Sequence, residues 1–379
     1  MSLSLPDLGD LTPTDPNRRQ GVLARIHLDL PLLLGLALIC AFGSVILYSA
    51  SGENAAQVER QLVRFGLAFV VLVGVAQIRP EQLFRWSPWL YILGTLMLIG
   101  VLAFGDVGKG AQRWLDLGVI RFQPSEMVKL AVPMMIAWYL ADKALPPTWQ
   151  RLALAAVLIV LPVLLIAKQP DLGTSLLVAS AGAFVLFLAG ISWRLIAGLL
   201  ALGAAAAPVL WFLMRDYQKQ RVLTFLDPEK DPLGAGYHII QSKIAIGSGG
   251  IWGKGWLNGT QSQLDFLPER HTDFIFAVLS EEFGLVGVVT LLLLYLFVIL
   301  RGLYIATRAQ DTFGRLLAGS LTLVFFVYLL VNAGMVSGLL PVVGVPLPLV
   351  SYGGTSLVTL MAGFGMLMSI HTHRKLLPR

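Results

Sequence analysis

The sequence predicts an all-α polytopic membrane protein with about ten transmembrane helices around a central polar cavity. Only 13% of its 379 residues are charged and 56% are hydrophobic, whereas soluble domains carry about 25% charged residues. The apolar residues fall in runs of about 17–25, each long enough to cross a bilayer as a helix. Ionisable residues interrupt several runs, and at membrane depth such groups usually face protein, a wet cavity or a partner.

Ten runs qualify as membrane spans, and polar or turn-forming residues separate them. The predicted spans are residues 29–49, 62–78, 86–104, 124–141, 150–167, 172–190, 194–213, 273–300, 313–337 and 349–370. Only a three-residue link joins the sixth span to the seventh, which predicts a tight hairpin. Residues 214–272 separate the seventh and eighth, and a structureless loop of that length is unusual. We therefore expect a short interfacial helix near residues 236–247.

Three segments make up the predicted chain: a cytoplasmic N-terminal tail (1–26), a transmembrane domain (27–370) and a cytoplasmic C-terminal tail (371–379). The N-terminal segment is polar and lacks the pattern of a cleavable signal peptide. With this end inside, basic residues divide evenly between the two sides. Half of the outer ones lie in the loop 214–272, and the rule that basic residues favour the inner side barely applies to so long a loop. An even number of spans returns the C-terminus to the cytoplasm and places the long loop outside.

Composition and motifs argue against several classes of function. The net charge of +6 is scattered among the spans instead of forming the basic face of a nucleic-acid-binding protein. Cys40 is the single cysteine, so no disulfide can form within the chain. His371 and His373 are too few for a metal site, and the sequence has no Walker A, zinc or dinucleotide motif. No internal repeat is visible, which weighs against an inverted-repeat transporter.

A cluster of charged residues precedes and opens the fourth span. Arg113 lies in the connecting segment, Pro124 favours a helix start, and Glu126 and Lys129 follow one helical turn apart. One interpretation is a self-neutralising pair that seats the helix. The other is that Arg113 and Lys129 face the cavity and bind phosphate or pyrophosphate, the arginine as a fork and the lysine as a point charge.

Two more polar groups adjoin the ends of spans. Asp171 can cap the helix that follows it, or it can line the polar cavity together with Lys168. Lys219 and Arg221 lie just beyond the seventh span. They are either interface anchors that extend their charged ends to water or contacts for an anionic headgroup.

The most informative carboxylates lie at the start of the eighth span. Asp273 and Glu281 are eight residues apart, about two helical turns, so the spacing predicts that both fall on one helix face. They can form structural ion pairs. Alternatively, partial burial and a neighbouring acid can raise the pKa of a carboxyl group toward neutral pH, which suits a general base. His271 is a candidate to orient a substrate, or it is an ordinary interface residue.

The segment between the last two spans is rich in proline and glycine. It runs from Asn332 to the turn Ser351-Tyr-Gly-Gly-Thr-Ser356. Irregular backbone at membrane depth is tolerated where protein buries it or where it lines a wet cavity. The backbone N–H groups and hydroxyls of this turn suit an anion or a sugar, and a simple helix cap is the alternative.

These blocks, in this order and on ten spans, resemble the SEDS family (shape, elongation, division and sporulation) over nearly the whole chain beyond the N-terminal tail. Three of them are most similar to elongation members: Leu267-Pro-Glu-Arg-His-Thr-Asp-Phe-Ile-Phe276, Gln169-Pro-Asp171 and Pro346-Leu-Pro-Leu-Val-Ser-Tyr-Gly-Gly354. Division and sporulation members share most of these blocks.

The resemblance implies a peptidoglycan glycosyltransferase that polymerises lipid II on the outer face of the bacterial cytoplasmic (inner) membrane, during cell elongation and rod-shape maintenance. It implies that Asp273 is the essential aspartate and Glu281 the second acidic position. It implies a cavity lined by Arg113, Glu126, Lys129, Lys168, Asp171 and Arg221. It also implies a class B penicillin-binding transpeptidase and other elongation-complex proteins as partners.

The mechanistic hypothesis is an attack by the acceptor 4-hydroxyl on the anomeric carbon of a lipid-pyrophosphate-linked glycan, with Asp273 taking the proton. Arg113, Lys129 and Arg221, with or without a divalent cation such as Mg²⁺ or Mn²⁺, stabilise the departing pyrophosphate. Cations separated from acids would limit self-neutralisation and leave positive potential for the leaving group. The alternatives are a lipid II flippase, a non-catalytic scaffold that activates the transpeptidase, and a proton-coupled transporter.

Overall fold

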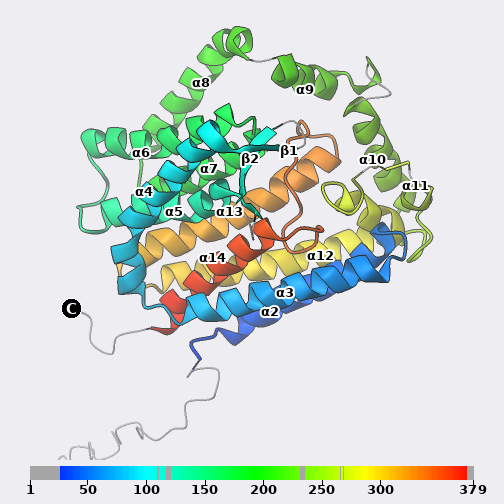
Figure 1. Cartoon of the computed structure of the whole chain (residues 1–379), viewed down its shortest axis with the longest axis horizontal. Helices are drawn as coiled ribbons and strands as arrows, with labels where there is room; N and C mark the ends of the chain where they lie inside the picture. The colour runs from blue at the N-terminus through cyan, green and yellow to red at the C-terminus, as the bar shows by residue number, and fades with distance from the viewer. Residues whose placement is uncertain are drawn as a thin grey trace, which may run out of the picture.

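The computed structural model describes residues 26–373 except 109–110, 117–120, 215, 231–234, 265 and 268. Most of the two predicted tails therefore lies outside the described residues. Within them the protein is built almost entirely from helices (Figure 1). The predicted class, a polytopic helical membrane protein, is confirmed.

Each predicted span contains a helix. These helices are α2 (Leu30–Ala50), α3 (Ala55–Ala76), α4 (Pro80–Phe104), α5 (Pro124–Ala141), α6 (Trp149–Lys168), α7 (Leu172–Leu188), α8 (Trp193–Leu213), α12 (Ile275–Thr307), α13 (Thr312–Val336) and α14 (Thr355–Thr372). Among the described helices, those long and apolar enough to cross a membrane by length and composition are α2, α4, α6, α12, α13 and α14.

Three helices begin six or seven residues away from the predicted positions. Helix α3 begins seven residues early, at Ala55, because the Asn54 side chain accepts a hydrogen bond from Gln57 N–H at 3.2 Å and caps a polar first turn. Helix α4 begins at Pro80, a residue suited to the first helical position. Helix α14 begins at Thr355 instead of 349, since the residues before it form an irregular segment. Hydropathy alone registers neither polar helical turns nor apolar irregular backbone.

Helix α13 lies at the centre of the bundle. It packs against α12, α7, α5 and α14, while α3 packs along α14 and α2 along α12. Polar side chains of α13 are buried as well as apolar ones: Ser320 and Asn332 are 0% exposed. Ser320 Oγ donates to the Ala181 carbonyl at 2.7 Å, which joins α13 to α7. The central helix therefore carries polar groups that find their partners inside the protein.

A small antiparallel sheet connects α4 to α5, and the sequence did not predict it. Its strands are β1 (Asp106–Gly108), β2 (Ala111–Asp116) and β3 (Arg121–Phe122), in the order β1-β2-β3. Strand β2 contacts both α4 and α5. The sheet therefore fixes the place of Arg113, which lies on β2, beside the two helices.

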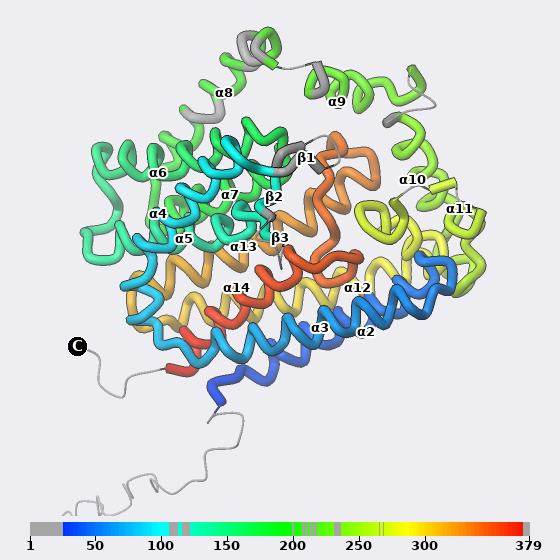
Figure 2. The backbone as a smooth tube through the Cα atoms, in the orientation of Figure 1, coloured from blue at the N-terminus to red at the C-terminus, as the bar shows by residue number. Residues whose placement is uncertain are grey.

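The long loop between α8 and α12 is largely helical. It contains α9 (Asp216–Leu226), the 3₁₀ turn η2 (Pro228–Lys230), α10 (Ala235–Gly249) and α11 (Thr260–Gln263). Helix α10 confirms the predicted helix near 236–247. Helix α9 has η2 and α10 as its main neighbours, whereas α10 packs on α12. In Figure 2, α8 and α9 run along the upper edge of the molecule, away from α13.

The two described ends of the chain lie together. The rings of His27 and His373 stack with centroids 3.8 Å apart. Next to them, Asp29 caps α2 and forms an ion pair with Arg301 at 2.6 Å. Helix α2 thus begins at the same end of the bundle at which α14 ends, as an even number of spans requires.

Helix α12 is broken at Gly284, and the glycine-rich segment 247–255 forms hydrogen bonds with the backbone at the break. Gly284 has φ 62° and ψ −159°, which is not helical. Four backbone hydrogen bonds join the two segments: Leu285 N–H to Gly250 O (3.0 Å), Val286 N–H to Ile251 O (3.1 Å), Lys254 N–H to Glu281 O (3.0 Å) and Gly255 N–H to Glu282 O (3.0 Å). The polar backbone groups released by the break are thereby satisfied inside the protein, as an apolar surrounding requires.

Replacing Gly253 with Ala should destabilise this junction. Gly253 has φ +76°, and a Cβ there would lie 2.1 Å from the Glu282 carbonyl oxygen. Backbone strain alone costs about 1–3 kcal/mol at such a position. Gly247→Ala is the matched control, because a Cβ there meets nothing within 4 Å and Ala is favoured over Gly in a helix. Thermal unfolding in detergent should show a lower Tm for Gly253→Ala alone; equal Tm values would contradict the packing.

Candidate functional site

The turn that carries Asp273 is anchored through three successive backbone carbonyls. The His271 carbonyl accepts Tyr352 N–H at 2.8 Å, and the Thr272 carbonyl accepts Ser351 Oγ at 2.5 Å. The Asp273 carbonyl accepts Asn332 Nδ2 at 2.9 Å. The partners come from α13 and from the irregular segment 337–354, so the core of the bundle fixes this turn.

Asn332 and Ser351 are buried because their side chains form hydrogen bonds with backbone groups inside the protein. Asn332 Nδ2 also donates to the Val345 carbonyl at 2.8 Å, so one amide joins the Asp273 turn to the irregular segment. Ser351 is 7% exposed, and its Oγ accepts Leu347 N–H at 2.8 Å. These contacts make Asn332 and Ser351 positioning residues for Asp273. Direct contact of either with a substrate stays a prediction.

Asp273 lies two residues before the first residue of α12, and its side chain is half-buried. Its Oδ2 lies 3.6 Å from the position that a Cβ on Gly344 would take. Gly344 has φ +75°, a conformation that favours glycine, so the irregular segment approaches the carboxylate closely. The expectation that Asp273 and Glu281 share one helix face is wrong, because Asp273 precedes the helix.

Glu281 is buried, and residues 254–261, which lie between α10 and α12, bind its carboxylate. Its side chain is 0% exposed. It accepts hydrogen bonds from Lys254 Nζ (2.6 Å), Thr260 Oγ1 (2.9 Å) and Gln261 N–H (3.0 Å). These contacts hold α11 and the glycine-rich segment against α12. The geometry gives Glu281 a positioning role, and a direct part in the chemistry stays a prediction.

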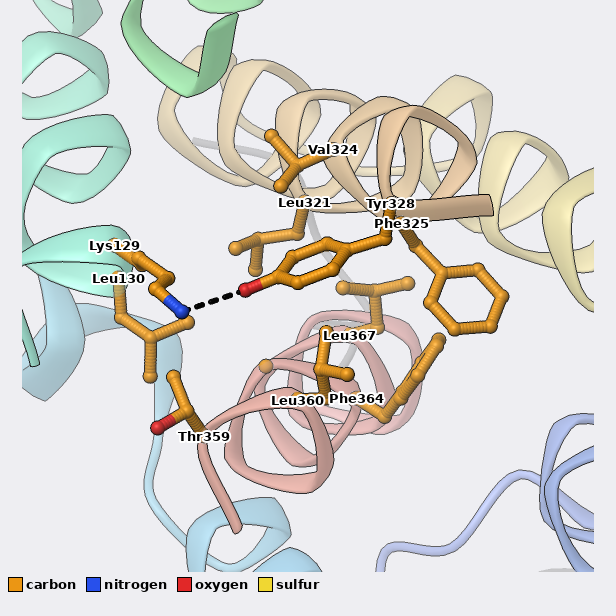
Figure 3. A pocket seen from close by; sticks show the side chains of 11 residues that line it. Lys129, Leu130, Leu321, Val324, Phe325, Tyr328, Thr359, Leu360, Phe364 and Leu367 are labelled. Atoms are coloured by element: carbon orange, nitrogen blue, oxygen red, sulfur yellow. Dashed lines mark hydrogen bonds between the residues drawn. The ribbon is translucent and has the colours of Figure 1, made fainter. Parts of the chain in front are cut away.

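A second cluster joins α5 to α13. Lys129 Nζ donates to Glu126 Oε1 and to the Tyr328 hydroxyl, each at 2.8 Å. Figure 3 shows Lys129 and Tyr328 pointing toward one another at the edge of a cavity of about 30 Å³, which apolar side chains of α13 and α14 line. Such a cavity has room for a water molecule. Glu126 Oε2 is buried without a hydrogen-bond partner among the described residues.

A third cluster lies where β2 meets the link between α6 and α7. Arg113 Nη2 donates to the Pro170 carbonyl at 2.5 Å, and Arg113 Nε lies 3.7 Å from Asp171 Oδ2. Asp171 also accepts Gln123 Nε2 at 3.3 Å and caps α7 through Thr174 N–H at 3.2 Å. The capping interpretation of Asp171 is therefore confirmed, and the same carboxylate also contacts Arg113. A role for Asp171 in lining the cavity together with Lys168 stays a prediction.

The hypothesis of separated charges is wrong for these two clusters. Lys129 is paired with Glu126, and Arg113 with Asp171. Sequence spacing could indicate the first pair but not the second, whose members are 58 residues apart and meet only in the folded chain.

The remaining predicted residues lie in different places. Lys168, in the last turn of α6, has an exposed side chain. Arg221 lies on α9, whose main neighbours are η2 and α10, and not in the Lys129 cluster. His271 packs edge-on against Tyr352 with ring centroids 5.9 Å apart. Substrate contacts of these three residues stay predictions.

His238 of α10 adds a neutral aromatic group near the Asp273 turn. Its ring stacks on Phe274, with centroids 5.6 Å apart. Burial lowers the pKa of His238 below its ordinary value, although the nearby Glu269 carboxylate acts in the opposite direction. The imidazole is therefore uncharged at neutral pH.

Sequence analysis missed three residues beside this site: Gln61, Arg64 and Tyr328. Gln61 and Arg64 lie on the inner side of α3 and contact the turn before α14. A signal was present for Arg64, because it is a charged residue inside an apolar helix. Tyr328 had no signal, since a tyrosine in an apolar helix is usually a packing residue.

The family model that matches the chain is FtsW/RodA/SpoVE, described as cell cycle protein, and it covers residues 23–376. The chain is 59% identical over 367 residues to the peptidoglycan glycosyltransferase MrdB of Escherichia coli (strain K12), covering 97% of this chain and 99% of that protein. It is 37% identical to the probable peptidoglycan glycosyltransferase FtsW of Geobacter metallireducens, covering 91% and 94%.

Solved structures are also similar. A chain of a structure described as "Structural coordination of polymerization and crosslinking by a peptidoglycan synthase complex" superposes with a TM-score of 0.80 at 37% identity, covering 92% of this chain and 98% of that one. The rod shape determining protein RodA of Thermus thermophilus superposes with a TM-score of 0.69 at 31% identity, covering 92% and 98%.

Proposed function

The chain belongs to the FtsW/RodA/SpoVE family and is a peptidoglycan glycosyltransferase, and we propose that it polymerises lipid II with Asp273 as the general base. The anchored turn at residues 271–273 carries this proposal. Three successive carbonyls bound by core residues hold the Asp273 backbone in one place. A base fixed in this way needs little reorganisation as the proton moves, which is what positioning contributes to catalysis.

The reaction exchanges one carbon–oxygen bond for another. The acceptor 4-hydroxyl attacks the anomeric carbon of the donor sugar, and Asp273 takes the hydroxyl proton. The bond from the anomeric carbon to the pyrophosphate oxygen breaks, and the pyrophosphate leaves with the electron pair. Neutral His238 next to the turn adds no positive charge beside Asp273.

The leaving pyrophosphate needs positive charge near it. Lys129 supports this role because an ammonium has three donors, and Glu126 and Tyr328 use two of them. In this proposal a divalent cation, Mg²⁺ or Mn²⁺, is an additional source of charge that enters with the pyrophosphate. Such ions are commonly held by substrate phosphates together with one or two carboxylates.

We place the protein in the bacterial cytoplasmic membrane with both termini inside and Asp273 at the outer face. The stacking of His27 on His373 supports a common side for the termini. We further propose a class B penicillin-binding transpeptidase as partner, by analogy with the similar chain from a complex described as coordinating polymerization and crosslinking. The 59% identity to MrdB, against 37% to the FtsW protein, favours cell elongation and rod shape over division.

Sealed vesicles containing the purified protein, its transpeptidase partner and fluorescent lipid II would test the function. We expect glycan ladders on a gel and no acceleration of lipid II movement between leaflets. Lipid movement without glycan would identify a flippase instead. Glycan from the transpeptidase partner alone would assign the polymerase to the other protein and leave this chain as a scaffold.

A further inference from the structure

Arg64 differs from Lys129 and Arg113, because no carboxylate within the described part of the chain forms an ion pair with it. It lies on α3 with a half-buried side chain, and its Cζ is 4.3 Å from the centroid of the Tyr352 ring. An arginine stays charged in proteins, and a charge among apolar helices usually serves a function.

The N-terminus of α14 lies beside Arg64. Its N-cap is Gly354, and no side chain caps the first turn among the residues described. A Cβ on Gly354 would lie 3.6 Å from both Cδ and Nε of Arg64. The first N–H groups of an 18-residue helix carry partial positive charge and have no partner within the helix. The guanidinium and the helix end therefore place positive charge in the same small region.

Gln61 supplies an independent sign that an acceptor belongs there. It is 1% exposed, and its Oε1 accepts Gly353 N–H at 3.3 Å, so its amide lies at the turn that starts α14. The other atom of this amide, Nε2, is buried with no hydrogen-bond partner in the described structure. A buried donor without an acceptor is unfavourable, and a bound ligand is one way to satisfy it.

The two glycines leave room for such a ligand. Among the described residues outside the glycine's own neighbours, a Cβ on Gly353 would meet only Ser356 Oγ, at 3.9 Å, and one on Gly354 would meet only Arg64. Without side chains at these positions, a ligand can approach the backbone N–H groups closely, as in other phosphate-binding turns.

This region is joined directly to the Asp273 turn. Tyr352 N–H and Ser351 Oγ, which hold the His271 and Thr272 carbonyls, come just before Gly353. In the proposed reaction the donor glycan carries one lipid-linked pyrophosphate and an acceptor lipid II molecule carries another, so two anionic groups must be held near Asp273. The cations Lys129 and Arg113 already face acids.

We propose that Arg64, Gln61 Nε2 and the N-terminal turn of α14 bind a phosphoryl group of a polyprenyl pyrophosphate substrate. The site supplies donors only, which suits a phosphate. This assignment rests on the proposed function, because it takes the ligand from that reaction. An anionic phospholipid headgroup has the same chemistry and is the other source that the experiment must distinguish.

The test measures binding of undecaprenyl pyrophosphate to the full-length protein in nanodiscs of neutral phospholipid. Arg64→Gln removes the charge, and Gln61→Glu keeps the acceptor for Gly353 N–H while replacing the orphan donor with an acceptor. We expect each to raise the Kd about 10- to 100-fold, the range for hydrogen bonds to charged groups. Arg60→Gln is the matched control, because Arg60 is exposed on the same helix one turn earlier, and its Kd should equal that of wild type.

Wild-type Kd values for both Arg64→Gln and Gln61→Glu, with Tm values unchanged, would overturn the site. Equal competition by phosphatidylglycerol would overturn the assignment to the substrate and identify a lipid headgroup as occupant. Because the readout is binding, it is separate from glycan synthesis. If the variants lose binding but the wild-type protein makes no glycan, the proposed reaction is rejected and the site is retained. If the wild-type protein makes glycan but the variants bind as wild type does, the site is rejected and the reaction is retained.

Discussion

Asp273→Asn should abolish glycan polymerisation while leaving the fold intact. The amide has nearly the same size and shape as the carboxyl group, and the three hydrogen bonds that anchor this turn to Tyr352, Ser351 and Asn332 go to backbone carbonyls. The substitution therefore removes the proton acceptor and leaves these three anchoring hydrogen bonds in place. General base catalysis contributes about 10²–10⁴-fold in rate, so lipid II ladders on a gel should fall below detection.

The matched control is Asp227→Asn. Asp227 lies in the loop 214–272 that precedes Asp273, and it pairs with Lys230 at 2.9 Å, with both side chains substantially exposed. Its loss should leave polymerisation at the wild-type rate. Undecaprenyl pyrophosphate should bind equally to both variants, since neither changes the cations. If Asp273→Asn polymerised as wild type does, Asp273 would be a structural residue and the base would be elsewhere.

The fold could be predicted where apolar length decides it. A run of apolar residues long enough to cross a bilayer has little choice but a helix, because its backbone must satisfy its own hydrogen bonds. The break at Gly284 could not be predicted, since the partners of the freed groups, Gly250 and Ile251, lie more than 30 residues away in sequence. The six-residue delay of α14 has a similar cause, because segment 337–354 is apolar but packs as irregular backbone.

The site was predictable in its landmarks but not in its contacts. Asp273, Asn332 and Ser351 stand out as polar residues in or beside apolar runs, and the structure brings them together. The role of each polar residue depends on the residues that it contacts, and the sequence does not show those contacts. Glu281 looks in sequence like a second catalytic acid, yet its carboxylate lies under Lys254 and Thr260. No spacing rule reports such long-range pairing.

Lys129→Met should destabilise the protein strongly, by about 3–5 kcal/mol, because it leaves the Glu126 carboxylate buried without its partner. Both side chains of the pair are less than 10% exposed, with a separation of 2.8 Å. The free energy of unfolding, from denaturant titration in detergent, measures the loss. Lys230→Met is the control: it breaks another i,i+3 pair, at 2.9 Å, but one that is exposed. It should cost less than about 1 kcal/mol.

The double variant Glu126→Gln, Lys129→Met decides between the two interpretations of this pair. Replacing both members of a buried ion pair is often close to neutral for stability, so the double variant should unfold at nearly the wild-type denaturant concentration. If the pair only seats α5, glycan synthesis should recover together with stability. We expect it to stay absent, because the ammonium that contacts Tyr328 at the cavity edge is then missing from the leaving-group side of the reaction. A stable double variant that polymerises lipid II would remove Lys129 from the catalytic machinery and leave the pyrophosphate to the remaining cations.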